Sequence, residues 1–341
     1  MAPESIQRDA RDAFVAIRDP RATETAPASR ARAQHAADYG PLAPLVADPR
    51  VTDIFVNGPR SVWVDRGSGL EPGPQLDLDE PALRLLAVRL VAVGGRHIDE
   101  ATPCVDTRLA DGARVHAVLP PIATAGTLLS IRLPRTTPFT LSDLDASGFF
   151  DRIPVPAVEA LVARRANILV TGAAGSGKTS LLGALLSAAP PTERIIAIED
   201  VAELRVRHAH FVSLEARQAN LEGAGGLGLA RLVREALRMR PDRLVVGECR
   251  GDEIRELLGA LNTGHDGGAG TLHANSLDDV PARLEALGAL AGMTPAAVAR
   301  QAVSAIGAVL HLERSDGVRR LAQLGSLAID SAGRLMARSS L

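Results

Sequence analysis

From residue 167 to residue 324, short apolar runs alternate with longer stretches in which apolar residues recur at helical spacing. The short runs, which predict buried strands, occupy 167–171, 195–199, 211–215, 244–246, the region near Thr271, 309–312 and 320–324. The helical stretches begin at Ser180, cover 228–239 and 252–262, and begin again at Leu277 and Pro295. Alternation of this kind predicts a mostly parallel sheet, which binds ligands at the carboxyl ends of its strands.

The first part of the chain follows a different pattern. Short apolar segments predict strands at 51–56, 62–64, 105–109, 114–119 and 128–133. Asn57-Gly58-Pro59 separates the first two strands and is typical of a hairpin turn. One helix is predicted over 83–93, because its leucines and valines recur at helical spacing, and Gly94-Gly95 ends it. We therefore expect a small α+β domain over 41–133.

Proline-containing segments mark the limits of the predicted domains. Residues 1–40 are rich in Ala, Arg, Asp and Pro, and predict a short helix near Ile6 to Ile17 followed by a mobile arm. Residues 134–156 are punctuated by prolines and predict a hinge or linker that contains one short helix after Thr140. The remainder, 157–341, is expected to form the larger α/β domain.

The composition is that of a globular protein without a basic field. A chain of 341 residues is long enough for two domains with their own cores. Its hydrophobic content of 46% and charged content of 23% are typical of a globular protein. The formal net charge of −2 and the aromatic content of 2% give little to attract or stack nucleic acid, so we expect no nucleic-acid partner. No apolar run reaches the length of a membrane span, and the polar N-terminus is unlike a signal peptide, which predicts a cytoplasmic protein.

The two cysteines, Cys104 and Cys249, fall in different predicted domains. No C-x-x-C pair is present, which excludes a cysteine-rich zinc module. We expect both side chains to be buried thiols in a reducing compartment.

The chain contains one lysine, Lys178, whereas every other strongly basic residue is arginine. This lysine lies in a G-x-x-x-x-G-K-T motif, Gly172 to Thr179, between a predicted strand and a predicted helix. In such a P-loop the backbone N–H groups cradle a phosphate, the lysine reaches the β- and γ-phosphates, and the threonine ligates Mg²⁺. A chance glycine-rich turn is the alternative. We predict that ATP and Mg²⁺ are bound here, by Gly172, Ala174, Gly175, Ser176, Gly177, Lys178, Thr179 and Ser180.

The strand predicted over 195–199 ends in two acidic residues, Glu199 and Asp200. Strand ends are where an α/β sheet presents functional groups, and carboxylates there hold Mg²⁺ or orient the attacking water. Both residues are therefore candidate metal ligands, and Glu199 is also a candidate catalytic residue. The alternative is structural, with Asp200 capping a helix that follows.

The next apolar strand repeats the arrangement, because Gly247 and Glu248 follow 244–246. This is a Walker B-like pattern, in which Glu248 is a candidate catalytic residue and metal ligand, alongside Lys178. Gly247 stands where many P-loop enzymes carry the aspartate that holds Mg²⁺, which disfavours generic helicases and AAA-type ATPases. The alternative is an ordinary strand followed by a capped helix.

Histidines and arginines supply further candidates for contact with the nucleotide. His265 and His273 lie in the glycine-rich segment 263–276, and imidazoles can donate to a phosphate and sense its presence. A metal site and a purely structural turn are the alternatives for this segment. Arg114, and Arg132 just before the predicted hinge, are candidates for charge stabilisation in phosphoryl transfer.

Four sequence boxes occur in a fixed order: the P-loop, Ile-Glu-Asp at 198–200, Gly-Glu at 247–248 and the histidine-containing segment 263–276. Together they resemble the secretion ATPase superfamily, which powers type II and type IV secretion and type IV pili. Within it, the chain looks most like the CpaF/TadA-like branch of Tad-pilus and conjugal-transfer ATPases. Features of that branch appear at 51–58, 106–114 and 236–243. The tetracysteine zinc module of many type II secretion ATPases is missing.

The resemblance implies a RecA-like P-loop ATPase domain preceded by a smaller, PAS-like α+β domain, assembled as a homo-oligomer, a hexameric ring, with ATP between the domains. It implies that Arg114 and Arg132 reach the nucleotide from the N-terminal side. It also implies that Glu199 and Glu248 serve water activation and Mg²⁺ binding; the choice of base between them stays open. His265 and His273 would carry the γ-phosphate signal to domain motion.

The expected function is an ATP-hydrolysing motor that powers pilus assembly or secretion through an inner-membrane platform protein. Such a motor would be peripheral to the inner face of the plasma membrane. One alternative is a nucleic-acid translocase of the RecA-like class. Another is a nucleotide-gated assembly scaffold that does not hydrolyse ATP.

Overall fold

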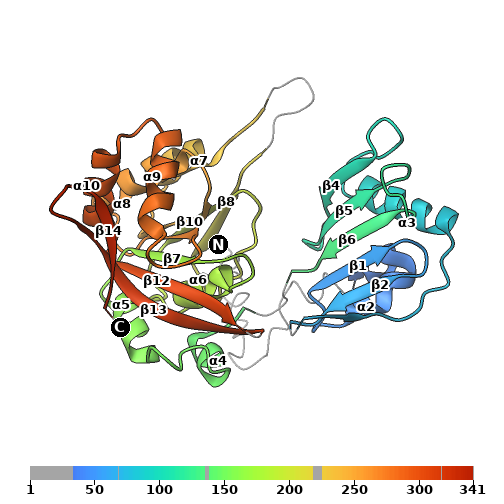
Figure 1. The fold of residues 1–341 in the computed structure, drawn as a ribbon, viewed down its shortest axis with the longest axis horizontal. Coiled ribbons are helices and arrows are strands. Elements are labelled where there is room, and N and C mark those ends of the chain that lie inside the picture. The colour runs from blue at the N-terminus through green and yellow to red at the C-terminus, as the bar shows by residue number, and fades with distance from the viewer. Residues whose placement is uncertain (1–33, 68, 135–137, 218–224, 316, 341) are drawn as a thin grey trace, which may run out of the picture. The chain divides into compact units, whose positions relative to one another are not determined.

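The computed structural model describes residues 34–67, 69–134, 138–217, 225–315 and 317–340. The chain divides into two compact units, which comprise Met1–Trp63 with Gly73–Thr136 and Val64–Pro72 with Thr137–Leu341. The division after Thr136 falls inside the segment 134–156 that was expected to be the hinge. Figure 1 labels most of the helices and strands of the two units.

The smaller sheet has six strands in the order β3-β2-β1-β6-β5-β4, and most of it belongs to the first unit. Its strands are β1 (Asp53–Asn57), β2 (Val62–Asp65), β3 (Leu70–Pro72), β4 (Cys104–Arg108), β5 (Arg114–Val118) and β6 (Leu128–Arg132). Alternate residues of β1, β5 and β6 are buried, so one face of the sheet packs inward. The predicted hairpin after β1 is present, and the Asn57 N–H donates to the Ser61 carbonyl at 2.7 Å.

One helix, α3 (Glu80–Val93), packs against β4 and β5. It begins where the Asp79 carboxylate accepts the Ala82 N–H at 2.9 Å, which is a standard N-cap. It ends at Gly94, a position that requires glycine because a Cβ atom there would lie 2.0 Å from the Thr107 hydroxyl oxygen. The same hydroxyl donates to the Gly94 carbonyl at 2.9 Å and ties the end of the helix to β4.

Helical structure begins before residue 41, in η1 (Ala36–Leu42) and α2 (Ala43–Ala47). Tyr39 is fully buried, and its hydroxyl donates to the Asp111 carboxylate at 2.7 Å. The folded part of the first unit therefore starts earlier than expected, because both the ring and the hydroxyl of Tyr39 find partners. The helix predicted near Ile6 to Ile17 lies outside the described residues.

One expectation about the cysteines is wrong. Cys249 is buried, but Cys104 is exposed, because β4 turns alternate residues outward and Cys104 is one of them. Cys104 lies in the first unit and Cys249 in the second.

The second unit contains a sheet in the order β14-β13-β12-β7-β11-β10-β8-β9. Its strands are β7 (Ile168–Gly172), β8 (Ile195–Glu199), β9 (Phe211–Glu215), β10 (Arg243–Cys249), β11 (Ala269–His273), β12 (Ala308–Ser315), β13 (Val318–Ile329) and β14 (Leu335–Ser339). The strands from β12 to β9 pair in parallel, and β13 and β14 continue the sheet antiparallel. The predicted, mostly parallel sheet is therefore confirmed.

Helices cover both faces of this sheet (Figure 1). They are α4 (Leu141–Ala146), α5 (Val155–Ala163), α6 (Lys178–Ser187), α7 (Leu229–Leu237), α8 (Glu253–Leu261), α9 (Val280–Leu290) and α10 (Pro295–Ala305). The first three share one core with Ile195 and Ala197 of β8. The other four share a second core with Ile196 and Ile198, which point to the opposite face of the same strand.

Most of the segment expected as a hinge is packed into the second unit. Thr140 caps the predicted short helix α4, because its hydroxyl accepts the Asp143 N–H and the Asp143 carboxylate accepts the Thr140 N–H at 2.8 Å. Leu144, Phe149 and Ile153 are buried in the core shared with α6. Burial of these side chains removes 141–153 from any flexible linker.

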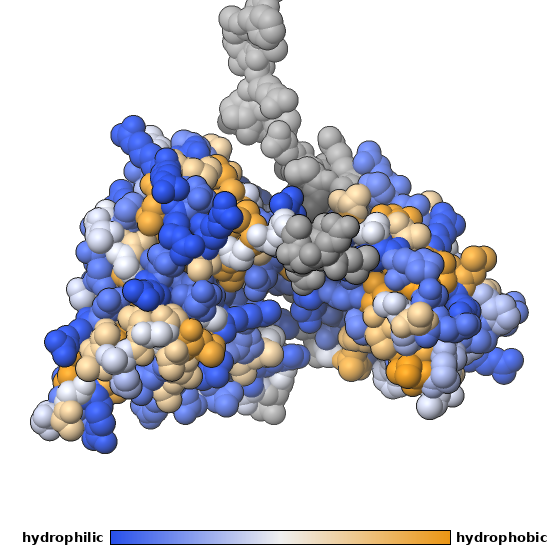
Figure 2. All heavy atoms as spheres, turned by 90° about the horizontal axis from the view of Figure 1, so that it is seen from above, coloured by the Kyte–Doolittle hydropathy of each residue, from blue (hydrophilic) through white to orange (hydrophobic). Residues whose placement is uncertain are grey.

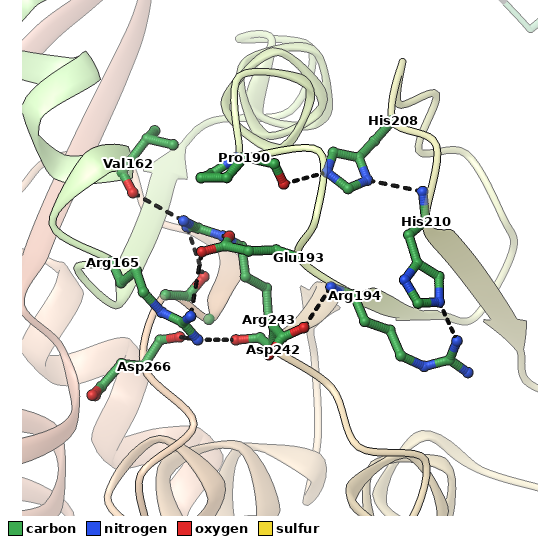
Figure 3. A network of polar contacts seen from close by, with 12 residues as sticks. Val162, Arg165, Pro190, Glu193, Arg194, His208, His210, Asp242, Arg243 and Asp266 are labelled. Carbon is green, nitrogen blue, oxygen red and sulfur yellow. Dashed lines mark hydrogen bonds and ion pairs between the residues drawn. The ribbon is translucent and has the colours of Figure 1, made fainter.

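The amino-terminal edge of the larger sheet is closed by the polar network of Figure 3. Arg243, the first residue of β10, is 3% exposed and forms an ion pair with Glu193. Arg165 contacts the same glutamate at 3.3 Å and donates to the Asp266 carbonyl at 3.1 Å. The charged side chains at this edge are therefore paired with one another. Ligands of parallel α/β sheets bind at the opposite edge, where the strands end.

The exposed surface is mixed in character. Figure 2 shows a mainly hydrophilic face in which apolar residues form scattered groups. Among the residues that the structure describes, no helix has both the length and the apolar character needed to cross a membrane.

Candidate functional site

The P-loop connects β7 to α6 at the carboxyl edge of the larger sheet. Gly177 precedes the helix with a φ of 101°, in the left-handed region that favours glycine. A Cβ atom on Gly172 would lie 2.6 Å from both the Ser176 hydroxyl oxygen and the Leu312 carbonyl oxygen. The loop can therefore close this tightly only because glycine occupies position 172.

Lys178 is folded inside the loop, with 8% of its surface exposed. Its ammonium donates to the Gly172 carbonyl at 2.9 Å and to the Ala173 carbonyl at 2.8 Å. Burial lowers the pKa of Lys178, and the charge of Glu248 opposes that effect. Because these bonds are to the loop's own carbonyls, the ammonium can exchange them for phosphate oxygens without leaving the loop.

His273 and Glu248 lie beside this lysine. His273 ends β11 and stands opposite Gly172 in the register of β11 with β7. Its Nε2 lies 2.9 Å from a Glu248 carboxylate oxygen and 3.5 Å from the Lys178 ammonium. Burial and the Lys178 charge lower the pKa of His273, with Glu248 opposing, which favours the neutral ring.

Arg250 belongs to the same group, although the sequence reasoning missed it. Its guanidinium donates to the second oxygen of Glu248, and that hydrogen bond raises the pKa of Arg250. Its side chain is 63% exposed, so most of its donors face solvent. The sequence spacing could have indicated Arg250, because residues two positions apart on an extended chain have their side chains on the same side.

Glu199 is buried at the end of β8, with 4% of its surface exposed. One carboxylate oxygen accepts the Glu203 and Leu204 N–H groups at 3.0 and 2.9 Å. The other oxygen is buried without a hydrogen-bond partner in the described part of the chain, and burial raises the pKa of Glu199 to about 7. No helix follows Asp200, which is exposed, so its interpretation as a helix cap is wrong.

His265 is not part of this P-loop site. It precedes β11, whereas His273 ends that strand, so the two histidines lie at opposite ends of β11. The His265 ring contacts the Ala260 carbonyl at 3.2 Å. A complete strand separates His265 from this P-loop, so the structure does not bring the two together, and contact of His265 with a nucleotide stays a prediction.

Arg114 and Arg132 lie in the first unit, directly opposite each other on β5 and β6. The Arg114 guanidinium donates to Asp106 at 3.1 Å, and the Arg132 guanidinium donates to Asp53 at 3.2 Å. Both arginines are exposed. The structure therefore places two predicted arginines side by side on one face of the smaller sheet, and their reach to a nucleotide stays a prediction.

The residues of the P-loop fit a bound phosphate. The Ser176 hydroxyl oxygen is fully buried and lacks a hydrogen-bond partner within the described residues, which a phosphate could supply. No three His, Cys, Asp or Glu side chains of that part of the chain converge as a metal site. A Mg²⁺ ion, where bound with a nucleotide, would be held by Thr179, carboxylates and phosphate oxygens, which is its usual mode with nucleotides.

Comparison with known proteins identifies the family. The model of the type II/IV secretion system protein family matches residues 35–315. The chain belongs to the type II/IV secretion system protein family. Members of this family are ATP hydrolases, so the protein is a secretion-system ATPase.

Individual relatives agree with this assignment. The chain is 49% identical over 305 residues to the "Putative conjugal transfer protein Rv3659c" of Mycobacterium tuberculosis, covering 87% of this chain and 86% of that one. It is 33% identical over 266 residues to the type IV secretion system protein VirB11 of Brucella suis, covering 70% and 73%. The structure of the Legionella pneumophila ATPase DotB, 20% identical, covers 85% of this chain and 76% of its own with a TM-score of 0.54, which supports the fold.

Proposed function

We propose that this secretion-system ATPase is the motor of a Tad-type pilus-assembly or secretion machine, and that it binds and hydrolyses Mg-ATP at its P-loop. The observation that carries the proposal is the convergence of Lys178, His273 and Glu248 at the end of β7. These residues come from three different segments of the sequence. A buried ammonium, an imidazole and a carboxylate in contact form a group that can meet a terminal phosphate and an attacking water.

The P-loop would hold the triphosphate through its backbone N–H groups and the start of α6. Lys178 would exchange the Gly172 and Ala173 carbonyls for phosphate oxygens, and the Ser176 hydroxyl would donate to the same ligand. Mg²⁺, when bound, neutralises charge on the β- and γ-phosphates. Thr179 is the first candidate to ligate it.

Of the two glutamates, Glu248 is the better candidate for the water-activating base. It contacts His273, which lies 3.5 Å from Lys178, whereas Glu199 lies one strand further from the P-loop. Glu199 keeps one buried oxygen without a partner, which suits a role in orienting a water or ligating Mg²⁺ through water. The exposed Asp200 is a second candidate for such an outer ligand.

The arginines of the first unit would complete the site by domain closure. Arg114 and Arg132 share one face of the smaller sheet, where each is held by an aspartate. Arginines supplied from another domain or subunit are a common way to stabilise charge in phosphoryl transfer. We infer a homo-hexamer in which nucleotide binding draws the two units together.

The cellular setting follows from the same proposal. The motor would work in the cytoplasm, at the inner face of the plasma membrane, on an integral-membrane platform protein. The segments 51–58, 106–114 and 236–243 support the Tad branch over other secretion ATPases. The names of the relatives, which refer to conjugal transfer and type IV secretion, support a machine of the type IV class.

Two measurements on the purified chain test the motor. We expect Mg-dependent ATP turnover, and a mass near six chains in the presence of ATP by light scattering. A chain that binds ATP tightly but does not turn it over would instead be a nucleotide-gated scaffold. In cells, a Lys178→Ala allele that leaves pilus formation and secretion intact would contradict the motor role.

A nucleic-acid translocase is the second candidate, because the name of one relative refers to conjugal transfer. It predicts that DNA or RNA stimulates ATP turnover and that the stimulation falls steeply with added salt. The net charge of −2 argues against such a partner. Turnover that is indifferent to nucleic acid would favour the motor.

A further inference from the structure

A hairpin formed by β12 and β13 extends past the carboxyl edge of the larger sheet, beside the P-loop. Leu312 of β12 is paired with Gly172, the last residue of β7, and β12 continues to Ser315. Arg314 and Arg319 face each other in the register of β12 with β13. Both arginines therefore lie past the carboxyl end of β7, the strand that leads into the P-loop.

These arginines contact the P-loop itself. The Arg319 guanidinium donates from Nε to the Gly175 carbonyl at 2.8 Å. Its Cδ lies 3.4 Å from the position a Cβ atom would take on Gly177, and Arg314 lies 3.6 Å from the same position on Gly175. The hairpin is held there by the Leu321 N–H, which donates to the Phe149 carbonyl at 2.8 Å.

The two guanidinium groups carry like charges on paired positions of β12 and β13. Within the described part of the chain, no carboxylate lies within ion-pair distance of Arg314 or Arg319, although many other arginines have one. Burial and the neighbouring Arg314 charge lower the pKa of Arg319, and the Asp65 charge opposes them. Two adjacent guanidinium groups next to an anion-binding loop favour an anionic ligand.

The position of the pair selects the part of the nucleotide it would meet. His273 and Leu312 stand on opposite sides of Gly172 in the sheet. Lys178, His273 and Glu248 gather on the β11 side, which is the side proposed for the γ-phosphate. The other flank of the loop is left for the α-phosphate and the nucleoside.

We propose that Arg319 and Arg314 bind the α-phosphate of the nucleotide, with Arg319 exchanging its bond to the Gly175 carbonyl for a bond to that phosphate. This inference rests on the proposed binding of nucleotide at the P-loop. It adds two residues to the site that no local motif indicates. It also assigns the β12–β13 hairpin a role in retaining ADP as well as ATP.

Calorimetric titration of ADP and of inorganic pyrophosphate, each with Mg²⁺, tests the proposal. The variants are Arg319→Gln and Arg314→Gln, with Arg338→Gln as the matched control, because Arg338 is an exposed arginine of β14 in the same sheet. Pyrophosphate can fill the P-loop without supplying an α-phosphate or nucleoside. We expect ADP binding to weaken about tenfold in either test variant, while pyrophosphate binding changes less than about twofold.

Three results would overturn the proposal. If the affinities for ADP and pyrophosphate fell equally, Arg319 would only shape the loop. If the ADP affinity were unchanged in both variants, neither arginine would contact the nucleotide. Binding of neither ligand by the unsubstituted chain would overturn the proposed function together with this inference. Arg314, which is exposed, provides a variant that keeps the fold if loss of Arg319 disturbs it.

Discussion

The side chain of Glu199 occupies the space that Gly247 leaves open on the neighbouring strand. A Cβ atom on residue 247 would lie 2.5 Å from Cγ of Glu199, closer than any real contact of this kind. Many P-loop enzymes carry an aspartate at the position of Gly247, to hold Mg²⁺. Here a carboxylate from β8, that of Glu199, lies in that space instead.

Replacing Gly247 with alanine should therefore disturb the site. The added methyl group would displace Glu199, which is buried and cannot move into solvent without cost. We expect a loss of about 1–3 kcal/mol in the free energy of unfolding, as is typical of overpacked cores, and a fall in ATP turnover with ADP binding largely kept. Urea unfolding, steady-state turnover and ADP titration measure these three quantities.

Gly259→Ala is the matched control for this prediction. Gly259 lies within α8, and a Cβ atom there meets nothing within 4 Å. Because alanine is the better helix former, this variant should be neutral or more stable by up to about 1 kcal/mol. Equal behaviour of the two variants would show that the contact between Gly247 and Glu199 has no energetic consequence.

The raised pKa of Glu199 predicts a stability that depends on pH. Its pKa is about 7 in the folded chain against an ordinary value of 4.5, so between these values the folded state binds more protons than the unfolded state. The unfolding free energy should therefore fall as pH rises from about 4.5 to 7. Glu199→Gln removes this group, and the difference between the two proteins should grow by about 2 kcal/mol between pH 5 and pH 8.

Denaturant unfolding at several pH values gives this difference directly. At pH 5 the two proteins should be nearly alike, because Glu199 is then protonated and resembles the amide. At pH 8 the variant should be the more stable one. A difference that is independent of pH would mean that Glu199 titrates normally and is reached by water.

Much of the second unit could be predicted from sequence because its strands are buried on both faces. Runs such as 195–199 and 244–246 stand out against their polar surroundings, and both became strands. The sequence pattern does not predict β14, because the exposed half of this strand contains no apolar run. α5 was missed because the prolines at its start were interpreted as part of a linker, whereas proline is compatible with the first turn of a helix.

The site was predictable as far as it is local in sequence. The P-loop carries its geometry within consecutive residues, so the motif alone located Lys178. His265 and His273 are eight positions apart, and only the strand between them shows that they lie at opposite ends of β11. Arg319 contacts the loop through the pairing of β12 with β7 and with β13, which no local pattern contains.

Lys178→Arg should lose most nucleotide affinity, although it keeps the charge. The ammonium fits between two loop carbonyls at 2.9 and 2.8 Å, and a planar guanidinium is too broad for that position. We expect binding weakened at least about tenfold in Lys178→Arg and in Lys178→Ala, measured by nucleotide titration. Near-normal affinity in either variant would contradict the assignment of the P-loop.

Glu248 and His273 should behave as a coupled pair. Glu248→Gln should keep ADP binding and lower turnover by about 10²–10⁴, which is typical for loss of a positioned general base. His273→Gln should cost less alone. Because the two side chains are in contact at 2.9 Å, the double variant should be scarcely slower than Glu248→Gln. Strictly additive losses in turnover would show that His273 acts independently of Glu248.

Arg132→Ala should weaken ATP hydrolysis while leaving the second unit folded, if closure of the first unit brings this residue to the phosphates. The single tryptophan, Trp63, lies on β2 and is 38% exposed, so its fluorescence can report a change of environment in the smaller sheet. We expect saturating ATP to change that fluorescence in the unsubstituted chain and to change it much less in Arg132→Ala. Arg50→Ala is a suitable control, because Arg50 is an exposed arginine of the same unit that pairs locally with Asp48 at 2.9 Å. If Arg132→Ala and Arg50→Ala gave the same fluorescence response and the same turnover as the unsubstituted chain, closure would not depend on Arg132.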